Sequence, residues 1–271
     1  MVEDTLQHNL PWYDSSWFSC YLKAKGYIER HQPDELDKFM HAMSVFRTDN
    51  SFSTQLVKDI FSDDQKEAIL KEVNQYKITD TELHELERFG RLVVHDNPYF
   101  DDLQEQTLEK VEALVDEKLE CSYNFFSFYL NDGHCPLHMD SPSAKWTLDY
   151  CIDQSAEWPI CLSDTIPWPE YWQDDNSVEN SASQDWVNYT KQSANFDSIS
   201  MKKNEAVIFS GSSQWHYRDK MVASGSSNFC KLLFLHYIPK GSADLLTPSN
   251  WENIIGIDGL TQGAELPNKK F

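Results

Sequence analysis

The distribution of short apolar segments along the chain constrains its fold more than any other feature. From residue 121 onward, runs rich in aromatic and β-branched residues alternate with turn signals, and each run has the length of a strand. The Asn-Asp-Gly at 131–133 is a strong turn signal after the first run. We therefore predict antiparallel strands in this half of the chain. The runs are SYNFFSFYL, KWTLDYCID, WPICLS, EAVIFSG and FCKLLFLHYIP.

Helical periodicity dominates earlier in the chain. Apolar side chains recur at helical spacing within residues 33–46, 62–76 and 101–119. Ser62 precedes two aspartates, a pattern typical of an N-cap and an acidic first turn. Because helices come first and strands follow, the sequence predicts an α+β fold. We expect a jelly-roll core, that is, a double-stranded β-helix, with helices packed outside it.

Three stretches divide the chain in this interpretation. Residues 1–53 form an N-terminal helical extension, residues 54–245 the jelly-roll domain, and residues 246–271 a C-terminal tail. Within the domain, residues 173–198 are polar and rich in Ser and Asn. Because strand-like runs resume after this segment, we predict a long loop or insertion there and not a linker between domains.

The charge balance limits the possible partners. The 271 residues include 44 acidic and 23 basic side chains, which gives a formal charge of −21. Nucleic-acid binding needs a basic surface, so we expect binding neither to nucleic acid nor to an anionic membrane. We find no apolar run of membrane-spanning length, and the acidic N-terminus lacks the apolar region of a signal peptide. Six cysteines without a CxxC pair indicate free thiols, and we expect a cytoplasmic protein.

The segment HCPLHMDSP concentrates possible metal ligands, namely His134, Cys135, His138 and Asp140. Side chains alternate along a strand, so His138 and Asp140 face the same side. A third ligand must come from another strand, and His216, which follows the run EAVIFSG, is the best candidate. Two histidines and a carboxylate on one side of an ion leave coordination positions open, which suits non-heme Fe(II).

A longer pattern around these residues resembles the Fe(II)- and 2-oxoglutarate-dependent oxygenases, in particular their prolyl 4-hydroxylase-like branch. Tyr129 is followed four residues on by Gly133, and then by the HxD of His138 and Asp140. Upstream, LVKDIFSDDQKEAILKEV resembles the strand and helix at the start of that domain. Downstream, MKKNEAVIFSGSSQWHYRD resembles the segment that supplies the distal histidine. The resemblance covers roughly residues 54–240.

The resemblance implies an activity and its cofactors. His138, Asp140 and His216 would bind Fe(II), with 2-oxoglutarate and O₂ as co-substrates, and Tyr129 would lie beside the 2-oxoglutarate. The resemblance also implies hydroxylation of an unactivated C–H bond. The related halogenases lack the carboxylate that Asp140 supplies, so halogenation is disfavoured.

The family also requires a basic side chain to pair with the distal carboxylate of 2-oxoglutarate. A charge-assisted pair in a mostly apolar cavity is the physical requirement. Lys231 opens the apolar segment KLLFLHYIP after the distal histidine, and we favour it because its position on that strand fits the family. Arg218 is the alternative, because it lies two residues after His216 and so faces the same side.

The chain departs from the family pattern in ways that leave the substrate open. It has SAEWPICL where the family often has a Gly-Gly pair, and the segment 173–198 is additional. Lys231 is also further from the distal histidine than is common in the prolyl branch. We expect a small-molecule substrate, such as an amino acid or a natural-product intermediate. The insertion and the aromatic N-terminal extension could form a lid over it.

Other functions and other roles for these residues remain open. The alternatives are a peptidyl or protein hydroxylase, a cupin-like metalloenzyme that does not use 2-oxoglutarate, and a non-catalytic jelly-roll binding module. A zinc site of His134, Cys135 and His138 is a weaker alternative, because closed tetrahedral geometry competes with the strand. We interpret His236 as a packed or hydrogen-bonded strand histidine. Arg91 could reach a substrate carboxylate, but we interpret it as a surface arginine. The sequence leaves the oligomeric state undetermined.

Overall fold

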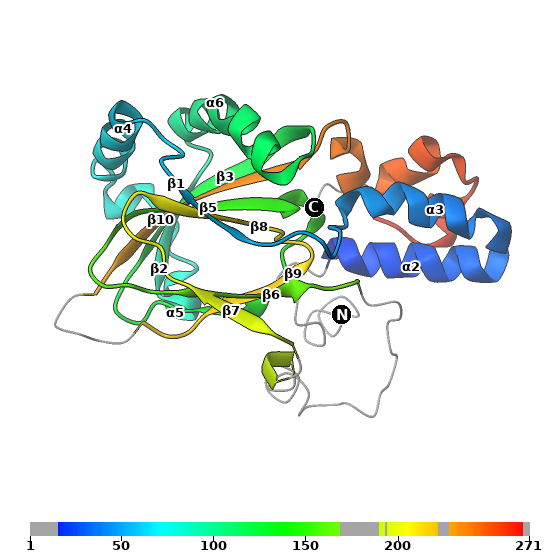
Figure 1. The fold of residues 1–271 in the computed structure, drawn as a ribbon. Coiled ribbons are helices and arrows are strands. Elements are labelled where there is room, and N and C mark those ends of the chain that lie inside the picture. The colour runs from blue at the N-terminus through cyan, green and yellow to red at the C-terminus, as the bar shows by residue number, and fades with distance from the viewer. Residues whose placement is uncertain (1–15, 169–189, 193, 222–227, 268–271) are drawn as a thin grey trace.

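Two antiparallel β-sheets form the centre of the structure (Figure 1). It is a computed structural model that describes residues 16–168, 190–192, 194–221 and 228–267. The larger sheet has the strand order β1-β8-β5-β10-β3-β2, and the smaller sheet has the order β4-β9-β6-β7. The larger sheet contains Gln55–Lys58 (β1), Arg91–His95 (β2), Leu119–Tyr129 (β3), Trp146–Gln154 (β5), Glu205–Phe209 (β8) and Cys230–Pro239 (β10). The smaller sheet contains Cys135–His138 (β4), Ile160–Thr165 (β6), Phe196–Ile199 (β7) and Gln214–Arg218 (β9).

Two helices cover the outer face of the larger sheet, α4 (Asp63–Val73) and α6 (Pro98–Val115) (Figure 1). Their buried apolar side chains pack with the outward-facing residues of β3 and β10 in one hydrophobic cluster. Ser62 caps α4, because its hydroxyl accepts a hydrogen bond from the backbone N–H of Gln65. The helix layer therefore fixes which side chains of these strands face outward and which face the smaller sheet.

A second hydrophobic cluster joins the two ends of the described chain. Helices α2 (Ser16–His31) and α3 (Leu36–Met43) pack against short helices near the C-terminus, and the rings of Trp17 and Trp251 lie 5.4 Å apart. The predicted N-terminal extension and C-terminal tail are therefore packed together. The shorter helical segments are Pro33–Glu35 (η1), Ser44–Phe46 (η2), Ile78–Asp80 (η3), Leu86–Phe89 (α5), Pro142–Ala144 (η4), Ala243–Leu246 (η6), Pro248–Asn250 (η7), Glu252–Gly256 (η8) and Leu260–Gly263 (α8).

The mixture of outer helices and antiparallel sheets agrees with the sequence prediction. The five predicted strand runs correspond to β3, β5, β6, β8 and β10. The helix expected over 101–119 ends at Val115, because Asp116 adopts a left-handed conformation with φ of 53°. The predicted loop 173–198 lies mostly outside the described residues, but its end belongs to β7, which pairs with β6. In the described part of the chain, no helix combines the length and the apolar composition needed to cross a membrane.

Candidate metal centre and its cavity

Strand pairing in the smaller sheet brings the predicted ligands together. His138 is the last residue of β4 and lies directly opposite His216 of β9 in the antiparallel register. Asp140 follows two residues later, while Met139 between them is buried in the apolar cluster around α2. The alternation expected from the sequence is therefore present, although β4 itself ends before Asp140.

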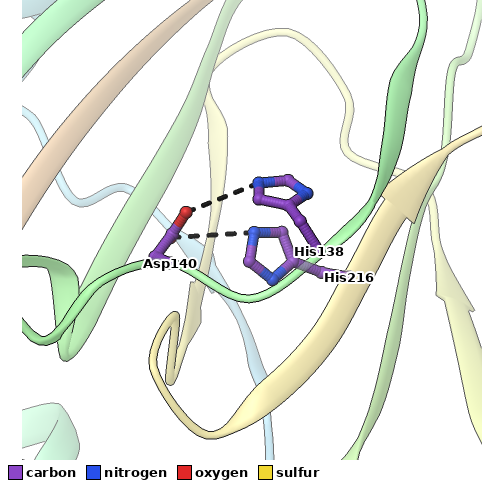
Figure 2. Close-up of side chains that lie close together, drawn as sticks. All are labelled: His138, Asp140 and His216. Atoms are coloured by element: carbon purple, nitrogen blue, oxygen red, sulfur yellow. Dashed lines mark ion pairs between the residues drawn. The ribbon is translucent and has the colours of Figure 1, made fainter. Parts of the chain in front are cut away.

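The three side chains converge on one point (Figure 2). The distance from His138 Nε2 to Asp140 Oδ1 is 3.4 Å, and that from His216 Nε2 to Asp140 Oδ2 is 3.7 Å. One ligand atom from each residue lies within 4.8 Å of the others, and among the described residues no other group of three histidine, cysteine or acidic side chains is arranged in this way. Two imidazole nitrogens and a carboxylate at this separation fit a divalent transition metal.

Backbone contacts hold the ligand atoms in a metal-binding orientation. Nδ1 of His138 lies 2.7 Å from the carbonyl oxygen of Pro136, and Nδ1 of His216 lies 3.0 Å from that of Gln214. A carbonyl only accepts hydrogen bonds, so each Nδ1 carries a proton, and each Nε2 faces Asp140 as the atom left for a metal ion to bind. Such partners fix the tautomer and ring orientation of metal-binding histidines.

The charges of the cluster are strongly coupled. Burial opposes ionisation of Asp140, but His216 and His138 outweigh it and hold the pKa of the carboxyl well below its usual range. Burial also lowers the pKa of His138, but Cys135 and Asp140 outweigh that effect and raise it to about 10. The protonated imidazole therefore balances a buried carboxylate. A bound metal ion would supply the same positive charge in exchange for the proton.

The cluster lines a partly open cavity of about 190 Å³ between the two sheets. Its lining is mostly aromatic, and it includes Arg218, Tyr129 and Arg91. Cys135 also lines the cavity, and its Sγ lies 3.9 Å from His138 Nδ1. His134 lies outside it, with its ring near the carbonyl of Asp132, so the structure does not group the residues of the alternative zinc site.

Arg218 is the buried cation of the cavity. It lies on β9 two residues after His216 and faces the same side, as predicted. One Nη donates to a carboxylate oxygen of Asp149 at 2.6 Å, and the other donates to the carbonyl of Trp158. Asp149 is fully buried, and burial raises the pKa of its carboxyl despite the opposing effect of Arg218. The ion pair therefore gives each buried charge a counter-charge.

Tyr129 and Arg91 also line the cavity and contact each other. Arg91 donates from Nη1 to the Tyr129 hydroxyl at 2.8 Å and pairs with the Glu85 carboxylate through Nε. The Arg91 side chain is only 12% exposed, so the interpretation of Arg91 as a surface arginine was wrong. Arg91 is the first residue of β2, and no sequence pattern had predicted that strand. Its pairing with β3 brings the guanidinium to Tyr129.

Lys231 lies away from the cavity, which corrects the sequence interpretation that favoured it. Its Nζ donates to Asn74 Oδ1 at 2.7 Å, at the end of helix α4. The physical reason is strand alternation. Phe234 and His236 of β10 line the cavity, so Lys231 points with Leu233 toward the helix layer. Lys231 therefore has no route to a ligand at the metal centre.

The comparisons with known proteins rest on structure alone. No protein-family model and no curated protein matches the sequence. HygX from Streptomyces hygroscopicus, solved with nickel, 2-oxoglutarate and hygromycin B bound, has 11% identity and a TM-score of 0.49, covering 74% of this chain and 87% of that chain. EctD from S. alaskensis, solved with 2-oxoglutarate and 5-hydroxyectoine, has 10% identity and a TM-score of 0.49, with 75% and 77% covered.

A third solved structure has the same degree of similarity. The non-heme alpha ketoglutarate dependent epimerase SnoN from nogalamycin biosynthesis has 10% identity and a TM-score of 0.48, covering 77% of this chain and 87% of that chain. Likenesses at this level do not assign an activity. The functional argument therefore rests on the geometry of the metal centre and its cavity.

Proposed function

We propose that this chain is an Fe(II)- and 2-oxoglutarate-dependent dioxygenase that hydroxylates an unactivated C–H bond of a small molecule. The observation that carries the proposal is the convergence of His138, Asp140 and His216 on a cavity between the two sheets, with both Nδ1 atoms held by backbone carbonyls. Such a set of ligands leaves coordination positions open for a chelating co-substrate and O₂. We interpret the strands β8-β5-β10-β3, together with the facing strands β4-β9-β6-β7, as the expected jelly-roll core. This core is consistent with the proposed activity.

Arg218 takes the role that the sequence had assigned to Lys231. It is buried at the cavity two residues from His216, and the ring of Trp158 lies against both Arg218 and Tyr129. A guanidinium has five donors and holds carboxylates through paired hydrogen bonds, so Arg218 can keep its contact with Asp149 and still bind the distal carboxylate of 2-oxoglutarate. Tyr129, held by Arg91, adds a hydroxyl donor.

The residues of the chain then have distinct tasks. Iron with 2-oxoglutarate and O₂ supplies the oxidation of the C–H bond. Arg218 and Tyr129 orient the co-substrate, and the aromatic lining excludes water from the cavity. The Asp140 carboxylate occupies a ligand position that a halide would need, so we propose hydroxylation and not halogenation.

Anaerobic addition of Fe(II) and 2-oxoglutarate tests the proposal. We expect a metal-to-ligand charge-transfer absorption band, followed by release of succinate when O₂ is admitted. Both should be lost in His138→Ala and Asp140→Ala, whereas the matched control His134→Ala should retain them, because His134 lies outside the cavity. Metal binding without the band would favour a cupin-like metalloenzyme. The absence of metal binding would favour a non-catalytic module, and either result would overturn the proposal.

A further inference from the structure

Five ring-bearing side chains form a continuous surface inside the cavity. They come from the inner faces of β2, β3 and β10, and all of them line the cavity. Rings of β3 and β10 stack on one another, Tyr123 on His236 at 4.1 Å and 24° and Phe125 on Phe234 at 4.7 Å and 24°. His95 lies 5.3 Å from Phe125 and is tilted by 45°. We call this surface the ring wall, and it consists of His95, Tyr123, Phe125, Phe234 and His236.

The ring wall lies beside the metal centre. The hydroxyl of Thr147 is 3.0 Å from His236 Nδ1 and 3.5 Å from Asp140 Oδ2. Thr147 therefore bridges the wall to a metal ligand. A molecule packed on the wall would lie next to the His138, Asp140 and His216 cluster, near which the C–H bond to be oxidised must be.

One polar atom of the wall has no partner among the described residues. His236 is 2% exposed, its Nε2 makes no hydrogen bond, and burial lowers the pKa of its imidazole to about 4. The ring is therefore neutral near pH 7. Its Nδ1 faces Thr147, and the Thr147 hydroxyl has the Asp140 carboxylate as a charged acceptor for its single proton. We assign the Thr147 proton to Asp140, so that Thr147 accepts from Nδ1–H and Nε2 keeps a lone pair.

The charges at the cavity disfavour an anionic substrate. Both guanidiniums among the described lining residues have carboxylate partners, Arg91 with Glu85 and Arg218 with Asp149. In the proposed function, the dianionic 2-oxoglutarate would also occupy the Arg218 side. A second anion on the ring wall would find no unpaired guanidinium, and the chain carries a formal charge of −21.

We propose that the ring wall is the substrate-binding surface, and that it selects a neutral compound with a planar ring whose hydroxyl or amine N–H donates to His236 Nε2. This inference rests on the proposed function for its catalytic meaning. Planar rings gain about 0.5–1.5 kcal/mol from stacking beyond burial of their area, so flat compounds would bind better than aliphatic ones of similar size. The hydrogen bond would also satisfy a buried nitrogen.

Three probes that share one ring system test the proposal by calorimetry on the full chain, loaded anaerobically with Fe(II) and 2-oxoglutarate. 2-Naphthol has a neutral ring and a donor, 2-methoxynaphthalene lacks the donor, and 2-naphthoate is an anion. We expect 2-naphthol to bind about tenfold more tightly than 2-methoxynaphthalene, as one hydrogen bond allows. We expect 2-naphthoate to bind most weakly. The preference for the hydroxyl should disappear in His236→Phe and persist in His41→Phe, which alters an exposed histidine of α3.

The outcomes separate this inference from the proposed function. The charge-transfer band in the same samples reports on the metal centre, and the three affinities report on the ring wall. A normal band with equal affinity for 2-naphthol and its methyl ether, with tightest binding of 2-naphthoate, or with no binding of any probe would overturn the ring-wall proposal alone. If His236→Phe does not fold, which its thermal melt would reveal, the wild-type comparison of the three probes still decides.

Discussion

Two groups of polar side chains that line the cavity differ in how they are satisfied. In the first, which we call the paired group, Arg218 and Arg91 are each paired with a carboxylate and hydrogen-bonded further. In contrast, His236 Nε2 is buried among rings without a partner in the described part of the chain. A group held by several protein partners keeps one geometry, which suits a constant co-substrate. A nitrogen that lacks a hydrogen-bond partner suits the substrate, because a bound substrate can then supply the missing hydrogen bond.

Removing the Arg218 guanidinium should disrupt the paired group most severely. Arg218→Met leaves the Asp149 carboxylate buried without its counter-charge, and we expect a loss of about 3–5 kcal/mol in the free energy of unfolding. The double variant Arg218→Met/Asp149→Leu should recover most of that stability but not 2-oxoglutarate binding. Urea unfolding and titration of the charge-transfer band measure the two effects. Recovery of 2-oxoglutarate affinity in the double variant would remove Arg218 from the co-substrate site.

A smaller change should disturb the metal centre. A Cβ on Gly211 would lie 2.4 Å from Asp140 Oδ2 and 2.4 Å from the carbonyl of Ala144, so Gly211→Ala must shift the groups around the carboxylate. Changes to the residues that orient metal ligands typically cost 10–100-fold in affinity, and we expect a loss of about that size for Fe(II). Gly26→Ala is the matched control, because its Cβ would meet no atom closer than 3.8 Å. Equal metal affinity in both variants would contradict the placement of Asp140.

The neutral state of His236 predicts a dependence of stability on pH. Its pKa is about 4 in the folded protein and 6.5 for an ordinary histidine, so the unfolded chain binds the additional proton between these values. The stability is complete above pH 6.5 and declines as the pH falls toward 4. Between pH 7 and 5 the decline due to this residue is about 2 kcal/mol. Urea unfolding of the metal-free protein should show this part of the decline in the wild type and not in His236→Gln. Parallel pH profiles would show that His236 is not buried neutral.

The metal centre could be predicted from the sequence because it depends on local alternation and one strand pairing. His138 and Asp140 are two residues apart, and His216 follows a clearly apolar strand, so few arrangements were available. The positions of Arg91 and His95 could not be predicted, because they require the pairing of β2 with β3, and β2 is short and lacks a strong strand signal.

The wrong prediction for Lys231 also arose because the sequence does not show how the strands pack. The sequence shows that Lys231 and His236 alternate to opposite faces of β10, but only packing against α4 shows which face is inside.

Substitution of Lys231 should have the smallest effect on stability and on 2-oxoglutarate binding. It therefore contrasts most clearly with substitution of Arg218 in the paired group. Lys231→Met removes an exposed hydrogen bond to Asn74, so we expect unfolding free energy to change by at most about 0.5 kcal/mol. The apparent affinity for 2-oxoglutarate should not change, because Nζ points to the helix layer. Arg218→Lys, by contrast, keeps the charge but loses the paired geometry, and should weaken 2-oxoglutarate binding about tenfold. Titration of the charge-transfer band with both variants measures this difference, and a stronger effect at Lys231 would restore the role that the sequence alone had suggested.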